Sequence, residues 1–168
     1  MASETSLLGA AGEHYVMCEL LRRGYIAALA PQGVPNMDIV VTTAEGENLC
    51  AIQVKSRRDV GADGGWHMRP KHETLINDNI FYIFVDLGKT PEHAPKTYII
   101  KSVDVAKALS KSHAAWLKNP GKGGRKRKDN PMRRLLPDYT KAFLPDHCPY
   151  PKGWLKPFKD AWHLIEAS

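Results

Sequence analysis

The sequence feature that most constrains the fold is a nearly continuous apolar run at residues 81–87, FYIFVDL. A run without polar alternation is typical of a central strand that is buried on both faces of a sheet. The periodicity elsewhere predicts helices at residues 5–23, 71–79, 103–117 and 157–167, and strands at residues 25–30, 38–43, 49–57 and 97–101. Helices that flank a mixed sheet, in an α/β fold, are the architecture that this order favours.

The first predicted helix carries an acid among apolar residues. Leu7, Ala11, Cys18 and Leu21 form one apolar stripe, with Ala10, Met17 and Leu20 beside it, and Cys18 and Cys50 are expected to be core thiols. Glu13 has Ala10, Met17 and Leu20 as its helical neighbours. A carboxylate that faces inward needs a cation or a metal as partner. The alternative is that Glu13 sits at the helix edge and reaches solvent.

The charge is divided unevenly along the chain. Residues 1–117 hold 12 Lys and Arg against 13 Asp and Glu, whereas residues 118–168 hold 12 against 5. We therefore expect an α/β core at 1–117 and a basic loop with a helical extension at 118–168, packed on the same domain. A localised positive field suits a polyanion, most simply nucleic acid, and a solubilising tail is the alternative.

A predicted hairpin brings polar side chains together. Its turn centres near Gly46, so antiparallel pairing places Asp38 opposite about residue 54, within one or two positions. Alternation along the second strand puts Gln53 and Lys55 on one side and the apolar Ile52 on the other. A carboxylate, an amide and an ammonium are expected to converge at one end of the hairpin.

This set of side chains suits phosphodiester hydrolysis. Mg²⁺ prefers a few oxygen ligands and keeps several waters, so Asp38 and the Gln53 side-chain oxygen could hold one ion. Glu13 could bind that ion through a water, or bind a second ion. Lys55 could orient the attacking water and stabilise negative charge. The alternative is that Lys55 only pairs with Asp38, without a metal.

These residues resemble the PD-(D/E)XK nuclease superfamily over roughly residues 7–102. The matching pieces are GAAGEHYV, PNMDIVV and CAIQVKSR, followed by WHMRPKHETLINDNIFYIFVDL. The resemblance implies a restriction-endonuclease-like α/β/α sandwich with a mixed central sheet. It also implies dependence on Mg²⁺ or Mn²⁺, a nucleic-acid substrate with DNA favoured over RNA, and catalytic roles for Glu13, Asp38, Gln53 and Lys55. Many members are dimers, so a homodimer is a further expectation.

Two positions depart from the pattern of the superfamily. Met37 precedes Asp38, so the literal PD pair is absent, and Gln53 replaces the usual acid. An amide can bind Mg²⁺ but adds no charge, which lowers metal affinity unless Glu13 compensates. A nucleic-acid-binding protein that keeps the fold without activity is therefore the second hypothesis. A structural or partner-binding protein without nucleic-acid contact is the third.

Basic residues around the predicted site are candidates for nucleic-acid contact. They are Arg57, Arg58, Lys71, His72, Lys122, Arg125, Lys126, Arg127 and Lys128, the last five in a glycine-rich loop that we expect to be mobile. Trp66 could stack on a splayed base. The alternative for Trp66 is that it packs a loop as a lid.

The cysteines and the lengths of the apolar runs indicate the cellular location. The three cysteines lie far apart without a CxxC pair, which argues against a disulfide framework or a zinc knuckle. No apolar run has the length of a membrane span, and the N-terminus does not read as a signal peptide. We expect a cytoplasmic protein without a membrane partner.

Overall fold

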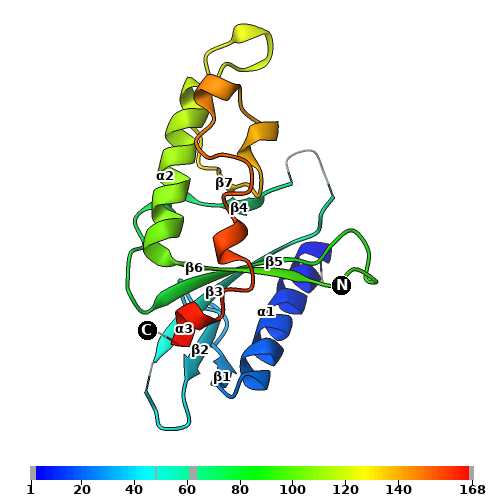
Figure 1. The fold of residues 1–168 in the computed structure, drawn as a ribbon, viewed down its shortest axis with the longest axis vertical. Coiled ribbons are helices and arrows are strands. Elements are labelled where there is room, and N and C mark those ends of the chain that lie inside the picture. The colour runs from blue at the N-terminus through cyan, green and yellow to red at the C-terminus, as the bar shows by residue number, and fades with distance from the viewer. Residues whose placement is uncertain (1–2, 48, 61–63, 167–168) are drawn as a thin grey trace.

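The computed structural model describes residues 3–47, 49–60 and 64–166. The helices are α1 (Glu4–Arg22), α2 (Ser102–Lys118) and α3 (His163–Glu166), and the strands are β1 (Ile26–Leu29), β2 (Ile39–Thr42), β3 (Cys50–Arg57), β4 (Trp66–Met68), β5 (Ile80–Asp86), β6 (Lys96–Lys101) and β7 (Arg133–Leu135). Five strands form one sheet in the order β1-β2-β3-β5-β6, and β4 pairs with β7 in a second, small sheet (Figure 1).

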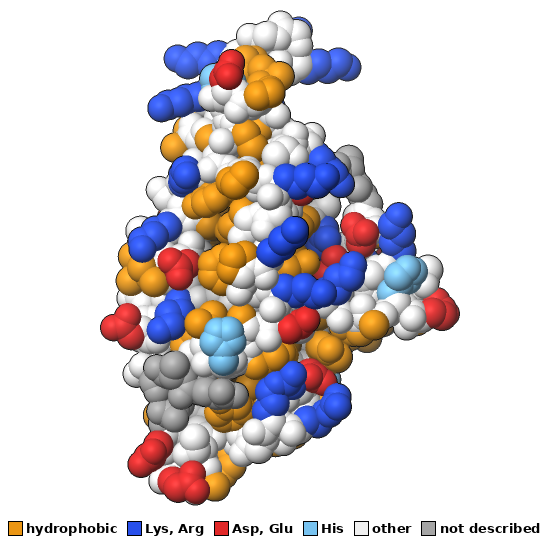
Figure 2. Space-filling view, viewed as in Figure 1, with side chains coloured by type: hydrophobic (Ala, Val, Ile, Leu, Met, Phe, Trp, Pro, Cys, Tyr) orange, Lys and Arg blue, Asp and Glu red, His pale blue; other side chains and the backbone are white. Residues whose placement is uncertain are grey.

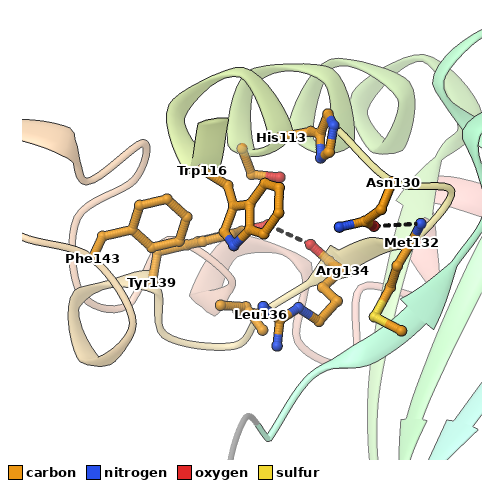
Figure 3. Close-up of a pocket in the computed structure, with 9 residues that line it drawn as sticks. His113, Trp116, Asn130, Met132, Arg134, Leu136, Tyr139 and Phe143 are labelled. Atoms are coloured by element: carbon orange, nitrogen blue, oxygen red, sulfur yellow. Dashed lines mark hydrogen bonds between the residues drawn. The ribbon is translucent and has the colours of Figure 1, made fainter. Parts of the chain in front are cut away.

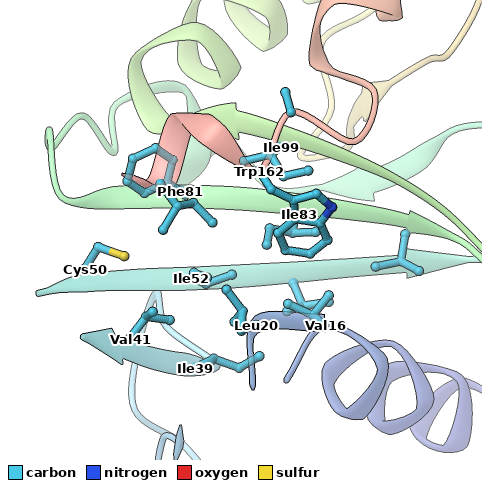
Figure 4. Close-up of a cluster of buried hydrophobic side chains, with 14 residues drawn as sticks. Val16, Leu20, Ile39, Val41, Cys50, Ile52, Phe81, Ile83, Ile99 and Trp162 are labelled. Carbon is cyan, nitrogen blue, oxygen red and sulfur yellow. The ribbon is translucent and has the colours of Figure 1, made fainter. Parts of the chain in front are cut away.

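The strand β5 is the central one, as its apolar run predicts. It pairs in parallel with β3 and antiparallel with β6, and residues 81–86 are all buried. Phe81, Ile83 and Val85 pack with α1 and the C-terminal segment around α3 (Figure 4). Tyr82 and Phe84 pack on the other face with α2 and the β4–β7 sheet. The layers therefore form an α/β/α sandwich around a mixed sheet, and the predicted fold class is confirmed.

The helix α1 turns a different side to the core from the one we predicted. Its buried residues are Gly12, Val16 and Leu20. Leu7 is 61% exposed and Leu21 is 51% exposed, and Cys18 is exposed as well. The expectation of a core thiol is wrong for Cys18 and right for Cys50. The side of α1 that faces the sheet is the one with Gly12, where the helix packs closely on β3. A stripe chosen by apolar content alone does not take this close packing into account.

Three local predictions also need correction. The glycine-rich stretch at 59–70 contains β4, whose partner β7 is more than sixty residues away in sequence and was not predicted. The helix predicted at 71–79 is a single 3-10 turn, η1 (Pro70–Glu73). The helix predicted at 157–167 is broken at Asp160, whose φ of 50° is not helical. The 3-10 turn η5 (Lys156–Phe158) precedes the break and α3 follows it, and residue 167 lies outside the described residues. Asp160 is held by Thr97, whose Oγ1 donates to Asp160 Oδ1 at 2.6 Å.

None of the described helices combines the length and the apolar content needed to cross a membrane.

Candidate functional site

The site begins where β3 extends beyond its neighbour β2. The two strands pair only from Ile39–Ile52 to Val41–Cys50, and Asp38 N donates to Ile52 O at 2.8 Å just before β2 begins. From that register Asp38 lies across from Gln53, one position from the centre of the expected range. The β2 side of β3 is therefore unpaired beyond this point, next to the Asp38 side chain.

Asp38, Gln53 and Lys55 lie on the same face of the sheet. The parallel register places Gln53 beside Tyr82 and Lys55 beside Phe84, so both face the α2 side. The elements on that side are α2, which packs on β5 and β6, and the β4–β7 sheet, which joins the same cluster and also contacts β3 through β4. Over β1–β3 the same face is open, with Ala28 exposed and both Val40 and Ala51 half-buried. The three polar side chains thus lie where the covered and the open halves of this face meet, with Gln53 buried and both Asp38 and Lys55 half-buried.

Two hydrogen bonds fix the Asp38 carboxylate. Its Oδ2 accepts from the Val54 backbone N at 2.7 Å and from the Gln53 side-chain Nε2. Neither bond uses Oδ1. The backbone bond orients the carboxylate along the edge of β3, and the amide of Gln53 adds a neutral donor beside it.

Glu13 reaches the site because α1 packs closely on β3 at the preceding residue. A Cβ at Gly12 would overlap Ser56 Oγ and would lie 2.9 Å from Ser56 Cβ. The absence of a side chain at Gly12 lets α1 approach the unpaired part of β3. Glu13 is half-buried there, and its charge interacts with those of Asp38 and Lys55.

The electrostatics show that these charged groups act on one another. Burial and, second, the charge of Asp38 raise the pKa of Glu13. Burial lowers the pKa of Lys55, while Asp38 and Glu13 oppose that shift. Burial, with Asp38 as the second cause, also raises the pKa of Tyr82. The site therefore holds two carboxylates that repel each other, Asp38 on the α2 side of the sheet and Glu13 on α1 at the opposite side. Both attract the partly dehydrated ammonium of Lys55.

The donor set fits a hard divalent cation. Across the parts of the chain that the structure describes, no three His, Cys, Asp or Glu side chains form a candidate metal cluster. Mg²⁺ needs only one or two carboxylates when it keeps its waters. Asp38 and Glu13 supply those carboxylates, and a cation between them would relieve their mutual repulsion.

The short helix η1 places two predicted residues beside the site, with different outcomes. Lys71 is exposed, and its Nζ donates to Asn36 Oδ1 at 3.1 Å, in the loop that leads to Asp38. Its charge contributes to the lowered pKa of Lys55. His72 is buried, and its Nδ1 lies 2.7 Å from Tyr82 Oη.

Burial, with the charges of Lys55 and Lys71, lowers the pKa of His72 to about 4. His72 is therefore neutral near pH 7, and it lies inside the molecule. We correct the expectation that His72 contacts phosphate, because neither its charge nor its exposure suits that contact.

Arg57 is not at the surface either. It is only 9% exposed, its Nη2 lies 2.6 Å from Asp86 Oδ2, and its guanidinium stacks 4.6 Å from the centre of the Trp66 ring. The expected role of Arg57 in nucleic-acid contact is therefore not retained, since its charge is used to anchor the loop before β4. Trp66 is 1% exposed, which fits a packed lid and excludes base stacking. Arg58, by contrast, is half-buried and bonds to Glu4 at 2.9 Å.

The basic loop after α2 is anchored at Arg127 and, near its end, at Asp129, whose Oδ1 lies 2.7 Å from His113 Nε2. Arg127 donates through Nε to Asn119 O at 2.8 Å, and its guanidinium lies 4.8 Å from the centre of the Trp116 ring. Lys122, Arg125, Lys126 and Lys128 are exposed. Figure 2 shows Lys and Arg side chains projecting to both sides at the end of the molecule where this loop lies. Arg127 therefore shapes the loop, and the other four present its charge.

A small cavity of about 70 Å³ lies at the base of this loop. Figure 3 shows its walls: His113 and Trp116 of α2 stand beside Asn130, Met132 and Arg134 of the following segment. His113 stacks on Trp116 with ring centres 5.5 Å apart. The His113 and Trp116 rings in this cavity are thus covered by each other.

Comparison with known proteins agrees with this geometry at the level of the fold. No protein-family model matches the chain, and no curated protein sequence matches it. Among solved structures, the bacterial homing endonuclease I-Ssp6803I superposes with a TM-score of 0.50 and 16% identity, over 98% of this chain and 93% of that one. The fold is restriction-endonuclease-like. It is the fold that the resemblance to the PD-(D/E)XK nucleases implied.

Another solved structure that is similar to this chain is the Holliday junction resolvase Hjc of Archaeoglobus fulgidus. It superposes with a TM-score of 0.43 and 15% identity, over 76% of this chain and 83% of that one.

Sequence reasoning missed three residues that shape the site. Gly12 was visible as a glycine within a helix, directly before the acid, and such a glycine often marks a close approach. Asn36, with φ of 66°, gave a turn signal before Asp38 but no hint of its bond to Lys71. Tyr82 was hidden in an apolar run, where only the strand register reveals that it lies beside Gln53.

Proposed function

We propose that this chain is a metal-dependent nuclease that hydrolyses phosphodiester bonds of nucleic acid, with DNA as the favoured substrate. The observation that carries the proposal is the convergence of Asp38, Gln53 and Lys55 on one sheet face, with Glu13 brought beside them by Gly12. A fold shared with an endonuclease supports the proposal.

The proposed roles follow from the charges of these residues. Asp38 and Glu13 would hold Mg²⁺ or Mn²⁺, with the Gln53 side-chain oxygen as a neutral ligand. The bound ion supplies positive charge at the phosphate and a more acidic water. Lys55, in its protonated form, would donate to a phosphoryl oxygen or to the attacking water, where a partly dehydrated charge acts more strongly than in bulk solvent. Lys71 would contact a neighbouring phosphate from the other side of the site.

A second candidate is a nucleic-acid-binding protein that has the fold without hydrolytic activity. One observation favours it: the Gln53 amide directs its Nε2 to Asp38 Oδ2, and so stabilises the Asp38 carboxylate without a cation. In that case the basic residues would bind nucleic acid and no phosphodiester bond would be broken.

The test is cleavage of supercoiled plasmid, linear duplex DNA, single-stranded DNA and RNA, with Mg²⁺, Mn²⁺ or a chelator. We expect DNA cleavage with either ion, and a loss of about 100-fold or more for Asp38→Asn and for Lys55→Met. Asp38→Asn keeps an oxygen that accepts from Val54 N, so the fold should persist. The matched controls are Asp78→Asn and Lys107→Met, which change exposed residues outside the site.

Each arm of this experiment decides one part of the proposal. Faster cleavage of RNA than of DNA would overturn the proposed preference. Binding without cleavage of any of the four substrates would reject the nuclease in favour of the second candidate. Full activity in Asp38→Asn would mean that the chemistry lies elsewhere in the molecule.

A further inference from the structure

A line of basic side chains connects the catalytic face with the basic loop. The small sheet β4–β7 lies between them, and its register pairs His67 with Arg134. Trp66, Met68 and Leu135 point into the core from the same two strands, so alternation turns His67 and Arg134 outward. Arg69, which follows β4, is exposed, and Lys71 lies two residues further along the chain. Positive charge thus continues from the site toward the end of α2.

The length of this surface follows from the helix beside it. The turn η1 lies against the first half of α2, where Glu73 shares a concave surface with Ala106 and Lys107. The basic loop follows Lys118, at the other end of α2. At about 1.5 Å per residue, the distance along the helix from Ala106 to Lys118 is about 18 Å. A duplex covers this distance with about five base pairs.

The chemistry of the surface suits a duplex better than a single strand. Proteins that hold single strands stack the bases on exposed aromatic rings. In the described ranges, every aromatic ring is buried or half-buried, and Trp66 and Tyr139 are each 1% exposed. Trp116, near the loop, is covered by His113 and Arg127. What this surface offers is a row of charges, which can contact the phosphates of a backbone whose bases remain paired.

We propose that the substrate is duplex nucleic acid, and that its flank on one side of the scissile phosphate lies along this surface as far as the basic loop. We call this surface the flank track; its residues are Arg69, Lys71, His67, Arg134, Lys122, Arg125, Lys126 and Lys128. The identity of the scissile phosphate rests on the proposed function. Binding along the track does not, and it can be measured in the absence of metal.

The experiment compares two charge-matched variants of the full chain in a chelating buffer. The loop variant replaces Lys122, Arg125, Lys126 and Lys128 by Gln and keeps Arg127, because Arg127 holds the loop to Asn119 and Trp116. The control variant replaces Lys96, Lys152, Lys156 and Lys159 by Gln. These four are exposed and belong to β6 and to the C-terminal segment, which bridges to β6 at Tyr98 and Lys159. The probes are labelled hairpin duplexes with stems of about 3 and about 20 base pairs, and single strands of matched length.

We expect the long duplex to bind the loop variant at least about 10-fold more weakly than wild type, with a salt slope reduced by up to about 0.9 per lost phosphate contact. The short duplex, which cannot reach both ends of the track, should show a much smaller difference between the two proteins. The control variant should bind like wild type on both probes. Single strands should bind more weakly than duplexes of the same length.

Two outcomes would overturn the inference. One is equal loss in the loop and control variants, which would mean that only net charge matters. The other is a single strand that binds as tightly as the long duplex. The fate of the proposed function is separate: a duplex-length dependence without cleavage in Mg²⁺ or Mn²⁺ would leave the flank track in place and reject the nuclease.

Discussion

Among the single residues, those of the candidate site are polar groups that are partly removed from water. Burial raises the pKa of Glu13 and lowers that of Lys55, so it disfavours the charged form of each. The neighbouring charges act in opposite directions on the two groups: Asp38 repels Glu13 but attracts Lys55. His72 supports the sheet face that carries Gln53, because it bonds to Tyr82, which lies beside Gln53.

The pH dependence of stability should report the buried state of His72. Its pKa is about 4 in the folded protein and near 6.5 when exposed. Between these values the unfolded chain binds a proton that the folded chain does not, so the free energy of unfolding falls as the pH drops from 6.5 to 4. His72→Gln keeps a partner for Tyr82 but does not titrate. Between pH 7 and pH 4, we expect the free energy of unfolding of His72→Gln to fall by up to about 3 kcal/mol less than that of wild type, measured by urea unfolding.

The same series of measurements can reject this account. If the free energy of unfolding falls equally in His72→Gln and in wild type between pH 7 and pH 4, His72 is protonated in the folded protein. Its burial then does not control its charge. Above pH 7 both proteins carry a neutral side chain at this position, so any difference there reports packing alone.

Among the elements, the contact between α1 and β3 determines where Glu13 lies. The helix contacts the sheet through Gly12, Val16 and Leu20, and Gly12 is the point at which it meets Ser56 of β3. The Ser56 hydroxyl is buried without a hydrogen-bond partner among the described residues, so it fills space there instead of linking the two elements. The volume of the Ser56 side chain therefore limits how closely α1 can approach β3.

Replacing Gly12 by Ala tests this contact. A Cβ overlaps Ser56 Oγ, and overpacking of this kind typically costs about 1–3 kcal/mol, more than the helical propensity gained from Ala. We expect thermal unfolding at lower temperature and reduced cleavage, because Glu13 is displaced with the helix. Gly9→Ala is the matched control: a Cβ there meets nothing within 4 Å, and Ala should stabilise α1 by up to about 1 kcal/mol.

A second substitution in β3 should compensate. In a Ser56→Gly background the overlap is gone, so Gly12→Ala should cost much less, and the coupling should appear in a double-mutant cycle. An equal cost of Gly12→Ala in both backgrounds would place its effect elsewhere than at this contact.

In the molecule as a whole, the segment after α2 contacts the turn η1, which lies beside the candidate site. Arg133 of β7 is 7% exposed, and its Nε donates to Glu73 of η1 at 2.7 Å. The same guanidinium donates through Nη1 to Asn130 O at 2.6 Å, at the end of the basic loop. Arg133 therefore links the loop to the turn that carries Lys71. We propose that residues 1–117 and 118–168 unfold as one unit.

The variant Arg133→Met should destabilise that single transition. It leaves the Glu73 carboxylate, whose side chain is only 19% exposed, without its partner, and removal of one member of a buried pair costs about 3–5 kcal/mol. Adding Glu73→Gln should recover part of the loss, since the unpaired charge is then gone. The measurement is urea unfolding followed by both circular dichroism and tryptophan fluorescence. Two separate transitions, with only the second shifted, would show that the extension folds independently.

The centre of the sheet and the hairpin that carries the site could be predicted from local sequence. The run at 81–87 has no polar alternation, so burial on both faces follows from its composition, and the central strand is confirmed. Asp38, Gln53 and Lys55 belong to one hairpin, where a short turn and the two-residue alternation limit the register to a few positions. Local periodicity and adjacent pairing carry this information because they do not depend on distant parts of the chain.

Tertiary contacts decide three features of the molecule: which side of α1 is buried, where the Arg57 side chain points, and which basic residues lie at the surface. The side of α1 that is buried follows from the fit of Gly12 against Ser56, which lies 44 residues further along the chain. Arg57 turns inward because Asp86 and Trp66 meet it from other strands, and β4 exists because β7 returns to pair with it. Each outcome depends on contacts between residues far apart in sequence, whose energies no local pattern contains.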